Sequence, residues 1–203
     1  MMQNQDLFEK LKEQHPTFTY EGFQYQYSEN QIDITFNFRI GETIQFTPSM
    51  RLTPGKHSIP IAEPKRLEGI IFHIGLIELI SYWKCACCPI VHVKGYRLTE
   101  AQQQWWKNLY WKGLGEFFYQ NGISSDIENF MTFSFDECAA PIEAFQCQKV
   151  AESDAVIVPI GGGKDSVVTL EHLKQKHRIV PFIINPRGAT LDCARVAGFP
   201  NEE

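Results

Sequence analysis

The residues that most directly suggest chemistry form a glycine-rich turn in the last quarter of the chain, Gly161-Gly162-Gly163-Lys164-Asp165-Ser166. Phosphate oxygens need many close N–H donors, and glycines let the backbone wrap an anion because they carry no side chains. A helix is predicted to begin at about Asp165 or Ser166, and its positive end would point at the same place. The Lys164 ammonium and the Ser166 hydroxyl add donors. The turn therefore predicts a phosphate-binding site.

Asp165 is the one residue of this turn whose charge does not suit an anion. Its carboxylate would repel a phosphate unless a divalent metal such as Mg²⁺ lies between them. The same carboxylate would instead suit the first turn of a helix if it served as the N-terminal cap. The sequence leaves both roles open.

Two other phosphate-binding motifs fit the turn less well. A Walker A loop needs glycine where Val158 stands and serine or threonine where Asp165 stands. A dinucleotide fingerprint needs an acidic residue at the end of the second strand, where this chain has Asn185 and Pro186. A turn that binds nothing is disfavoured, because three consecutive glycines expose the backbone at an entropic cost.

The turn resembles the signature loop of the PP-loop ATP pyrophosphatases, which is serine-glycine-glycine-x-aspartate-serine after a first strand. Gly162, Gly163, Lys164, Asp165 and Ser166 match this pattern, and Gly161 replaces the leading serine and removes its hydroxyl donor. The resemblance implies that the turn binds ATP and that the ATP is split between its α and β phosphates. A substrate oxygen is then adenylylated, and pyrophosphate leaves.

The elements around the turn predict the start of an α/β domain over residues 151–203. An apolar run at 155–160, a polar helix to about Lys176 and a second apolar run at 179–184 form a β-α-β unit. Short unbroken apolar runs are typical of parallel strands that are buried on both faces. Two strands and one helix leave apolar surface exposed, so we expect a parallel-sheet, Rossmann-like PP-loop domain that continues in a missing C-terminal segment.

Residues 1–150 are predicted to form a separate α+β domain of antiparallel strands and buried helices. Alternating apolar residues at 17–27 and 32–38 predict a β-hairpin, and a third strand is expected at 43–47. The proline-rich stretch from there to Pro64 is predicted to be a loop. Residues 69–84 are apolar nearly all round, which favours a buried helix.

A second helix is predicted from Thr99, with Thr99 and Gln102 as a capping box and Asn121-Gly122 as the stop. It carries too many aromatic residues for one stripe, which leaves two interpretations open: either they are all core, or some line a ligand pocket. Gly113 and Gly115 would let a backbone or ligand approach closely.

Four segments, together with Asn185-Pro186-Arg187, resemble the bacterial UDP-N-acetylmuramoyl-L-alanyl-L-glutamate epimerases over most of residues 67–188. These segments are Phe72-His73-Ile74-Gly75-Leu76, Ser81-Tyr82-Trp83-Lys84, Lys112-Gly113-Leu114-Gly115-Glu116-Phe117-Phe118 and Val158-Pro159-Ile160 with the glycine turn. The resemblance implies an isomerase that uses ATP and magnesium to invert the terminal L-glutamate of a nucleotide-sugar peptide. Alternatives are another adenylylating PP-loop enzyme, for tRNA thiolation or amide ligation, and a non-catalytic fragment.

The chemistry of such an epimerase is coherent. An α-proton beside a carboxylate is hard to remove, and adenylylation converts that carboxylate into an acyl group that can hold the enolate. A base and an acid on opposite faces then exchange the proton. The candidate acid/base groups in the chain are His73, Glu78, Lys84, Lys112 and Glu116, and spacing alone does not rank them.

The composition of the chain argues against nucleic-acid binding and against a membrane span. The 203 residues are 43% hydrophobic with a net charge of −5, and the basic residues form no stripe, so a nucleic acid is not expected as a partner. We expect a cytoplasmic protein with no membrane span. Two roles are open for the cysteine cluster Cys85, Cys87 and Cys88. The cysteines could form half of a metal site that His92 or His73 completes. They could instead be small buried residues at the end of a helix.

Overall fold

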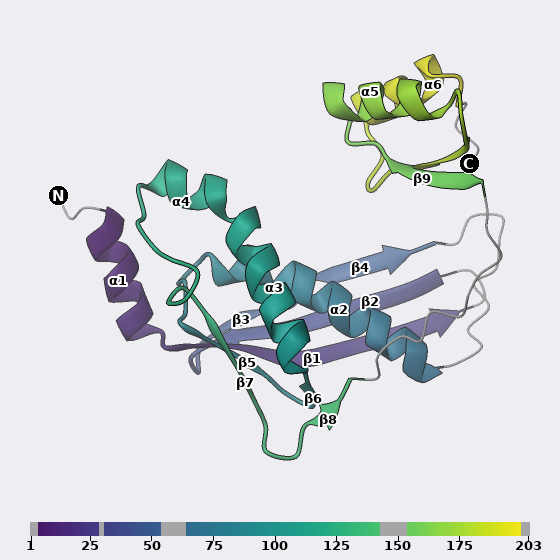
Figure 1. Ribbon diagram of the computed structural model, residues 1–203. Helices are drawn as coiled ribbons and strands as arrows, with labels where there is room; N and C mark the ends of the chain where they lie inside the picture. Colours follow the sequence, from purple (N-terminus) through teal and green to yellow (C-terminus); the bar gives the residue numbers. More distant parts are fainter. Residues whose placement is uncertain (1–3, 29–30, 54–63, 143–153, 200–203) are drawn as a thin grey trace. The chain divides into compact units, whose positions relative to one another are not determined.

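The computed structural model describes residues 4–28, 31–53, 64–142 and 154–199 (Figure 1). The chain divides into two compact units, Met1–Phe145 and Gln146–Glu203. The predicted boundary at residue 150 lies outside the described residues. None of the helices within the described ranges is long and apolar enough to cross a membrane.

Unit 1 is an α+β structure built on one mixed sheet. Its strands run in the order β3-β2-β1-β5-β7, and β4 also pairs with β2. The strands are β1 Thr17–Ser28, β2 Gln31–Ile40, β3 Ile44–Phe46, β4 Ser49–Leu52, β5 Ile90–Val93 and β7 Thr132–Phe135. A small parallel pair joins β6 Tyr96–Arg97 to β8 Ala140–Pro141.

The predicted hairpin is confirmed as the antiparallel pair of β1 and β2. Because side chains alternate across a strand, β2 buries every second residue against the helices. These buried residues are Ile32, Ile34, Phe36, Phe38 and Ile40.

The prediction that the strands of unit 1 are all antiparallel is wrong, because β5 runs parallel to both β1 and β7. The physical reason is the connection: β5 reaches β7 through two helices, and a crossover of that length returns the chain in the same direction. The predicted proline-rich loop also contains a strand, β4, which pairs with β2 at Ile32↔Leu52 through Thr35↔Ser49. Residues 54–63 of that stretch lie outside the described residues.

The described residues of unit 1 contain the helices α1 Asn4–Gln14, α2 Pro64–Trp83, α3 Glu100–Gly113 and α4 Gly115–Asn121. Figure 1 shows α2 lying along β1 and β2, with which it makes its contacts. The capping box of α3 is confirmed, since the Thr99 hydroxyl accepts from the N–H of Gln102 and the Gln102 side chain accepts from the N–H of Thr99. The predicted stop is confirmed too, because Gly122 ends α4 with φ 61°.

Two expectations about these helices need correction. The single helix expected from Thr99 to about Gln120 is broken between Gly113 and Gly115, and a Cβ placed on either glycine would meet nothing within 4 Å. These glycines therefore interrupt a helix and do not mark a close approach within the described residues. Helix α2 is also not buried all round, because Ile70 and Ile77 remain exposed beside α3.

In its described part, unit 2 contains the predicted β-α-β unit. Strands β9 Ala155–Pro159 and β10 Arg178–Phe182 pair in parallel, and α5 Lys164–Leu173 connects them. A further helix that the sequence did not predict, α6 Gly188–Val196, lies on the same side of β9 as α5 (Figure 1). The core joins both helices to the sheet through Val158, Ile160, Leu170, Ala194 and Ala197.

As expected for two strands with so few covering elements, one face of this sheet is uncovered within the described residues. Ile157 is 66% exposed and Phe182 is 50% exposed, and both belong to the face that α5 and α6 leave open. The described part of unit 2 is therefore not a complete PP-loop domain.

Candidate functional site

The glycine turn connects the end of β9 to the start of α5. The N–H of Ile160 donates to the carbonyl of Phe182 at 2.9 Å, which ties the last residue before the turn to the neighbouring strand. Helix α5 then begins at Lys164, one residue before the predicted start. A phosphate-binding turn needs this fixed strand on one side and a helix N-terminus on the other.

Gly162 is the residue whose geometry most requires glycine. Its φ is +80°, a conformation that other L residues rarely adopt. A Cβ at this position would lie 3.2 Å from the backbone nitrogen of Thr190 and 3.3 Å from the carbonyl carbon of Ala189, in the first turn of α6. The N-terminus of α6 therefore packs directly against the turn from which α5 begins.

The other two glycines leave the turn open. A Cβ on Gly161 or Gly163 would meet no atom within 4 Å, and both residues are exposed. No backbone hydrogen bond among the described residues uses the N–H groups of residues 161–166. Helix N-termini leave such donors unpaired, and two of them, those of α5 and α6, meet at this turn.

The side chains of the turn have different positions. Lys164 and Asp165 are exposed, and the Ser166 hydroxyl donates to the carbonyl of Gly163 at 2.9 Å. The proposed capping role of Asp165 is wrong, because the N-cap residue of α5 is Gly163 and no side chain caps it. The carboxylate stands in the first turn of the helix, where it is free for the magnesium role that the sequence also allowed.

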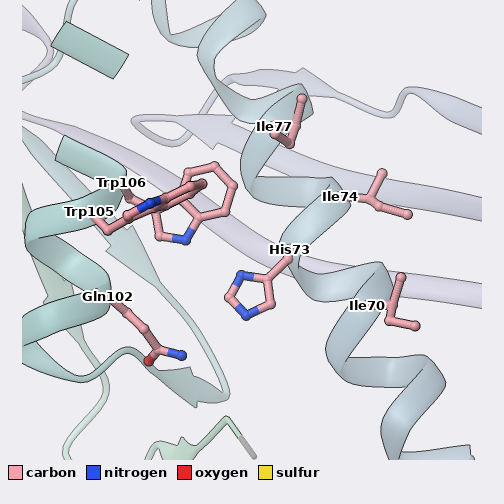
Figure 2. A pocket seen from close by; sticks show the side chains of 7 residues that line it. All are labelled: Ile70, His73, Ile74, Ile77, Gln102, Trp105 and Trp106. Carbon is pink, nitrogen blue, oxygen red and sulfur yellow. The ribbon is translucent and has the colours of Figure 1, made fainter. Parts of the chain in front are cut away.

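The five acid/base candidates do not converge. Glu78 lies half-buried on α2, while Lys84, Lys112 and Glu116 are exposed after α2, at the end of α3 and on α4. His73 lines a groove of about 460 Å³ between α2 and α3 (Figure 2). The groove is lined by Ile70, His73, Ile74, Ile77, Gln102, Trp105 and Trp106.

The imidazole of His73 is directed from α2 toward α3 and stacks on the indole of Trp106, with ring centroids 5.8 Å apart and planes 13° apart. Burial lowers the pKa of His73 below its ordinary value of 6.5. The ring is therefore neutral at pH 7. The interpretation that all of the aromatic residues of α3 and α4 are core is wrong, because Trp105 is 57% exposed. Trp106, Tyr110 and Phe118 belong to the core, and Trp105 and Trp106 line the groove, so a ligand pocket among these rings stays a prediction.

The cysteine segment follows α2. Cys85 is exposed, while burial raises the pKa of Cys87 to about 12 and that of Cys88 to about 11, so these thiols hold their protons at neutral pH. Among the described residues, no group of three His, Cys, Asp or Glu side chains is placed to hold a metal ion. Cys147 lies outside the described residues.

A hydrogen-bonded network that was not predicted from the sequence lies on the other face of the sheet of unit 1. His92 on β5 contacts the Ser134 hydroxyl at 3.0 Å and Asp136 at 3.1 Å, and Asp136 also accepts from the N–H of Gly95 at 3.0 Å. Finding it required the pairing of β5 with β7, which no local pattern revealed. The alternation of Val91, His92 and Val93 was the available signal.

By its architecture, unit 2 is an α/β unit in which an open glycine turn connects a parallel strand to a helix. The comparison with protein families is more specific: the chain belongs to the family described as the MurL N-terminal domain, which matches residues 9–202. The match covers both units.

One curated relative is the UDP-N-acetyl-alpha-D-muramoyl-L-alanyl-L-glutamate epimerase of Xanthomonas oryzae pv. oryzae (strain MAFF 311018). It is 32% identical over 100 residues, which are 49% of this chain and 21% of the relative. The matched part thus spans about a fifth of the relative's length. No solved structure matches the chain.

Proposed function

We propose that the chain is the N-terminal part of an ATP- and Mg²⁺-dependent epimerase that inverts the terminal L-glutamate of UDP-N-acetylmuramoyl-L-alanyl-L-glutamate. Membership of the MurL N-terminal domain family and the name of the Xanthomonas relative support the epimerase. The reaction consumes ATP to AMP and pyrophosphate and supplies a precursor of peptidoglycan. Because ATP and nucleotide sugars are cytoplasmic metabolites, the enzyme acts in the cytoplasm.

The observation that carries the ATP-dependent part is the geometry of the glycine turn. Its N–H groups have no partner among the described residues, and the N-termini of α5 and α6 meet there at Gly162. Such a group of neighbouring unpaired donors suits the oxygens of a polyphosphate. In this proposal the backbone of residues 161–163 holds the phosphates and Lys164 offsets their charge.

Asp165 and Ser166 complete the proposed ATP site. Asp165 is the residue of the turn that would hold Mg²⁺, because carboxylate oxygens are the ligands that this ion prefers. Magnesium bound there would offset the charge that develops as pyrophosphate leaves. The Ser166 hydroxyl, which donates to Gly163 in this structure, would turn to a phosphate oxygen when ATP is bound.

Adenylylation prepares the carbon acid. Once the carboxylate has become an acyl adenylate, the negative charge left by removal of the α-proton is delocalised onto a neutral carbonyl. A base and an acid on opposite faces of the carbon then exchange the proton, and hydrolysis releases the D-epimer with AMP. His73, Glu78, Lys84, Lys112 and Glu116 remain the candidates, and neutral His73 is the one in a pocket.

Further chain elements are needed to complete the ATP domain. The strands of unit 2 carry apolar side chains on both faces, and one face is uncovered within the described residues. Parallel sheets are normally covered on both faces. The proposal therefore includes further strands and helices that pack on this face.

The test measures pyrophosphate release and deuterium uptake in D₂O. It uses this chain joined to the segments that the Xanthomonas relative carries beyond the matched part, with ATP, Mg²⁺ and the nucleotide-sugar peptide. We expect pyrophosphate and AMP only when the substrate ending in glutamate is present, and deuterium at the α-carbon of that glutamate. Pyrophosphate release without deuterium uptake would favour a different adenylylating enzyme. A Gly162→Val variant is the control, and it should lose both products.

A further inference from the structure

The groove between α2 and α3 presents aromatic and aliphatic surface to solvent. Ile70, Ile74 and Ile77 line it from α2, because residues three and four apart share one helix face. Across the groove, Trp105 is 57% exposed, and its indole stands at 89° to that of Trp106. An exposed indole beside an aliphatic wall is a surface on which a planar ring can stack.

One hydrogen-bond donor in the groove has a fixed orientation. The side-chain oxygen of Gln102 accepts from the N–H of Thr99 at 2.9 Å and from its hydroxyl at 3.1 Å, as part of the capping box. The amide nitrogen is therefore on the opposite side, and it makes no hydrogen bond within the described part of the chain. Figure 2 shows this nitrogen on the side of the amide nearer His73.

His73 supplies the second polar group. Its ring is held against Trp106 by stacking, and neither ring nitrogen is hydrogen-bonded among the described residues. Because burial keeps the imidazole neutral, it offers one donor and one acceptor. The groove thus combines a fixed amide donor, a neutral imidazole and an open indole face.

We propose that this groove binds the uracil base of the nucleotide-sugar substrate. The inference rests on the proposed function, which supplies a uridine nucleotide as substrate and assigns the ATP phosphates to unit 2. A carbonyl oxygen of uracil accepts from the Gln102 amide, and the imide N–H donates to His73. The ring stacks on Trp105, while the isoleucines exclude water from its edge.

The test is calorimetric titration of the 203-residue chain with UMP. We expect saturable binding that weakens about tenfold or more in Trp105→Ala, as removal of a base-stacking ring does elsewhere. Gln102→Glu should weaken UMP binding similarly. The carboxylate keeps the side-chain oxygen that accepts from the N–H of Thr99, but it lacks the amide N–H that would donate to uracil. Tyr119→Ala is the matched control, since Tyr119 is an aromatic residue outside the groove with 86% exposure, and it should bind UMP unchanged.

Modified nucleotides test the edge of the base. UMP methylated at N3 lacks the imide proton and should bind at least about tenfold more weakly, since a site built for a hydrogen bond rejects the analogue that lacks it. AMP should also bind more weakly than UMP. Equal binding of AMP, an unaffected Gln102→Glu variant, or a Trp105-dependent dimer that UMP does not dissociate would overturn the inference.

The outcome is separable from that of the proposed function. Gly162→Val lies in unit 2 and should leave UMP binding unchanged while it abolishes pyrophosphate release. Binding of UMP without epimerisation would therefore contradict the proposed reaction and retain the groove assignment. Epimerisation without UMP binding that depends on the groove would contradict the groove assignment and retain the proposed reaction.

Discussion

Gly162 differs from its two neighbours in a way that the letters of the sequence do not show. Three consecutive glycines suggest three equivalent positions, yet only the middle one combines a positive φ with close contact to α6. Gly161 and Gly163 face open space, where a ligand can approach the backbone. The middle glycine thus shapes the turn, and the outer two expose it.

This difference gives a prediction for stability. Gly162→Ala should destabilise unit 2 by about 1–3 kcal/mol, because alanine is strained at positive φ and its Cβ crowds Ala189 and Thr190. Gly161→Ala and Gly163→Ala, where a Cβ fits, should change stability by no more than about 0.5 kcal/mol. Amide hydrogen exchange at the core positions Val158 and Leu170 measures the effect. If the amides of Val158 and Leu170 exchange equally slowly in all three variants, the prediction that Gly162→Ala is the destabilising one is wrong.

Helix α2 is positioned by a close approach to the sheet at Gly75. A Cβ there would overlap the hydroxyl of Tyr20 on β1, and it would lie 2.9 Å from a ring carbon of Phe36 on β2. The hydroxyl of Tyr20 is buried with no hydrogen-bond partner within the described ranges. Glycine at this position therefore lets the helix that carries His73 approach the two central strands.

We predict that Gly75→Ala destabilises unit 1 by about 1–3 kcal/mol, the usual cost of an overpacked core. Helix propensity alone predicts a gain of about 1 kcal/mol, so the sign of the change distinguishes the two effects. Urea unfolding followed by tryptophan fluorescence measures it, because all four tryptophans lie in unit 1.

Two further variants control this experiment. Gly115→Ala in α4 meets no atom and should be neutral or slightly stabilising. Adding Tyr20→Phe should partly restore Gly75→Ala, because it removes the overlapping hydroxyl. A Gly75→Ala protein that is as stable as the original would show that α2 is free to shift.

The elements that the sequence predicted are those whose signals are local. The hairpin of β1 and β2, the capping box at Thr99 and the Gly122 stop each depend on neighbouring residues, and each was confirmed. Strands β5 and β7 were missed because each has four residues and both pair with distant segments. Their parallel direction depends on the crossover through α3 and α4, which a local pattern does not encode.

The candidate sites also divide into features with local sequence signals and features that depend on distant segments. The glycine turn was found from sequence because consecutive residues form it, although the contact with α6 was not foreseen. The acid/base set was only a list of residue types, and the structure places His73 in the groove between α2 and α3. The capping box of Gln102 with Thr99 is local and was predicted from the sequence. The groove into which this cap directs the amide nitrogen of Gln102 depends on the packing of α3 beside α2, which the sequence pattern did not show.

The two units contribute separately to the proposed enzyme. Each has its own hydrophobic core, with residues such as Phe36 and Trp83 in unit 1 and Val158 and Leu170 in unit 2. The groove that we propose for uracil belongs to the first unit, and the turn that we propose for the ATP phosphates belongs to the second. We therefore expect nucleotide-base binding and polyphosphate binding to be lost separately, each through a single substitution in its own unit.

The most direct test of the account is an NMR titration of the 203-residue chain with magnesium pyrophosphate and with ATP. Both should shift the amide signals of residues 161–166 and those of Ala189 and Thr190 at the start of α6. Lys164→Ala should weaken these shifts, and amides of α2 and α3 should not respond to pyrophosphate. If the turn signals stay unmoved at millimolar pyrophosphate and ATP while unit 2 remains folded, the glycine turn is not a polyphosphate site and the ATP-dependent mechanism fails.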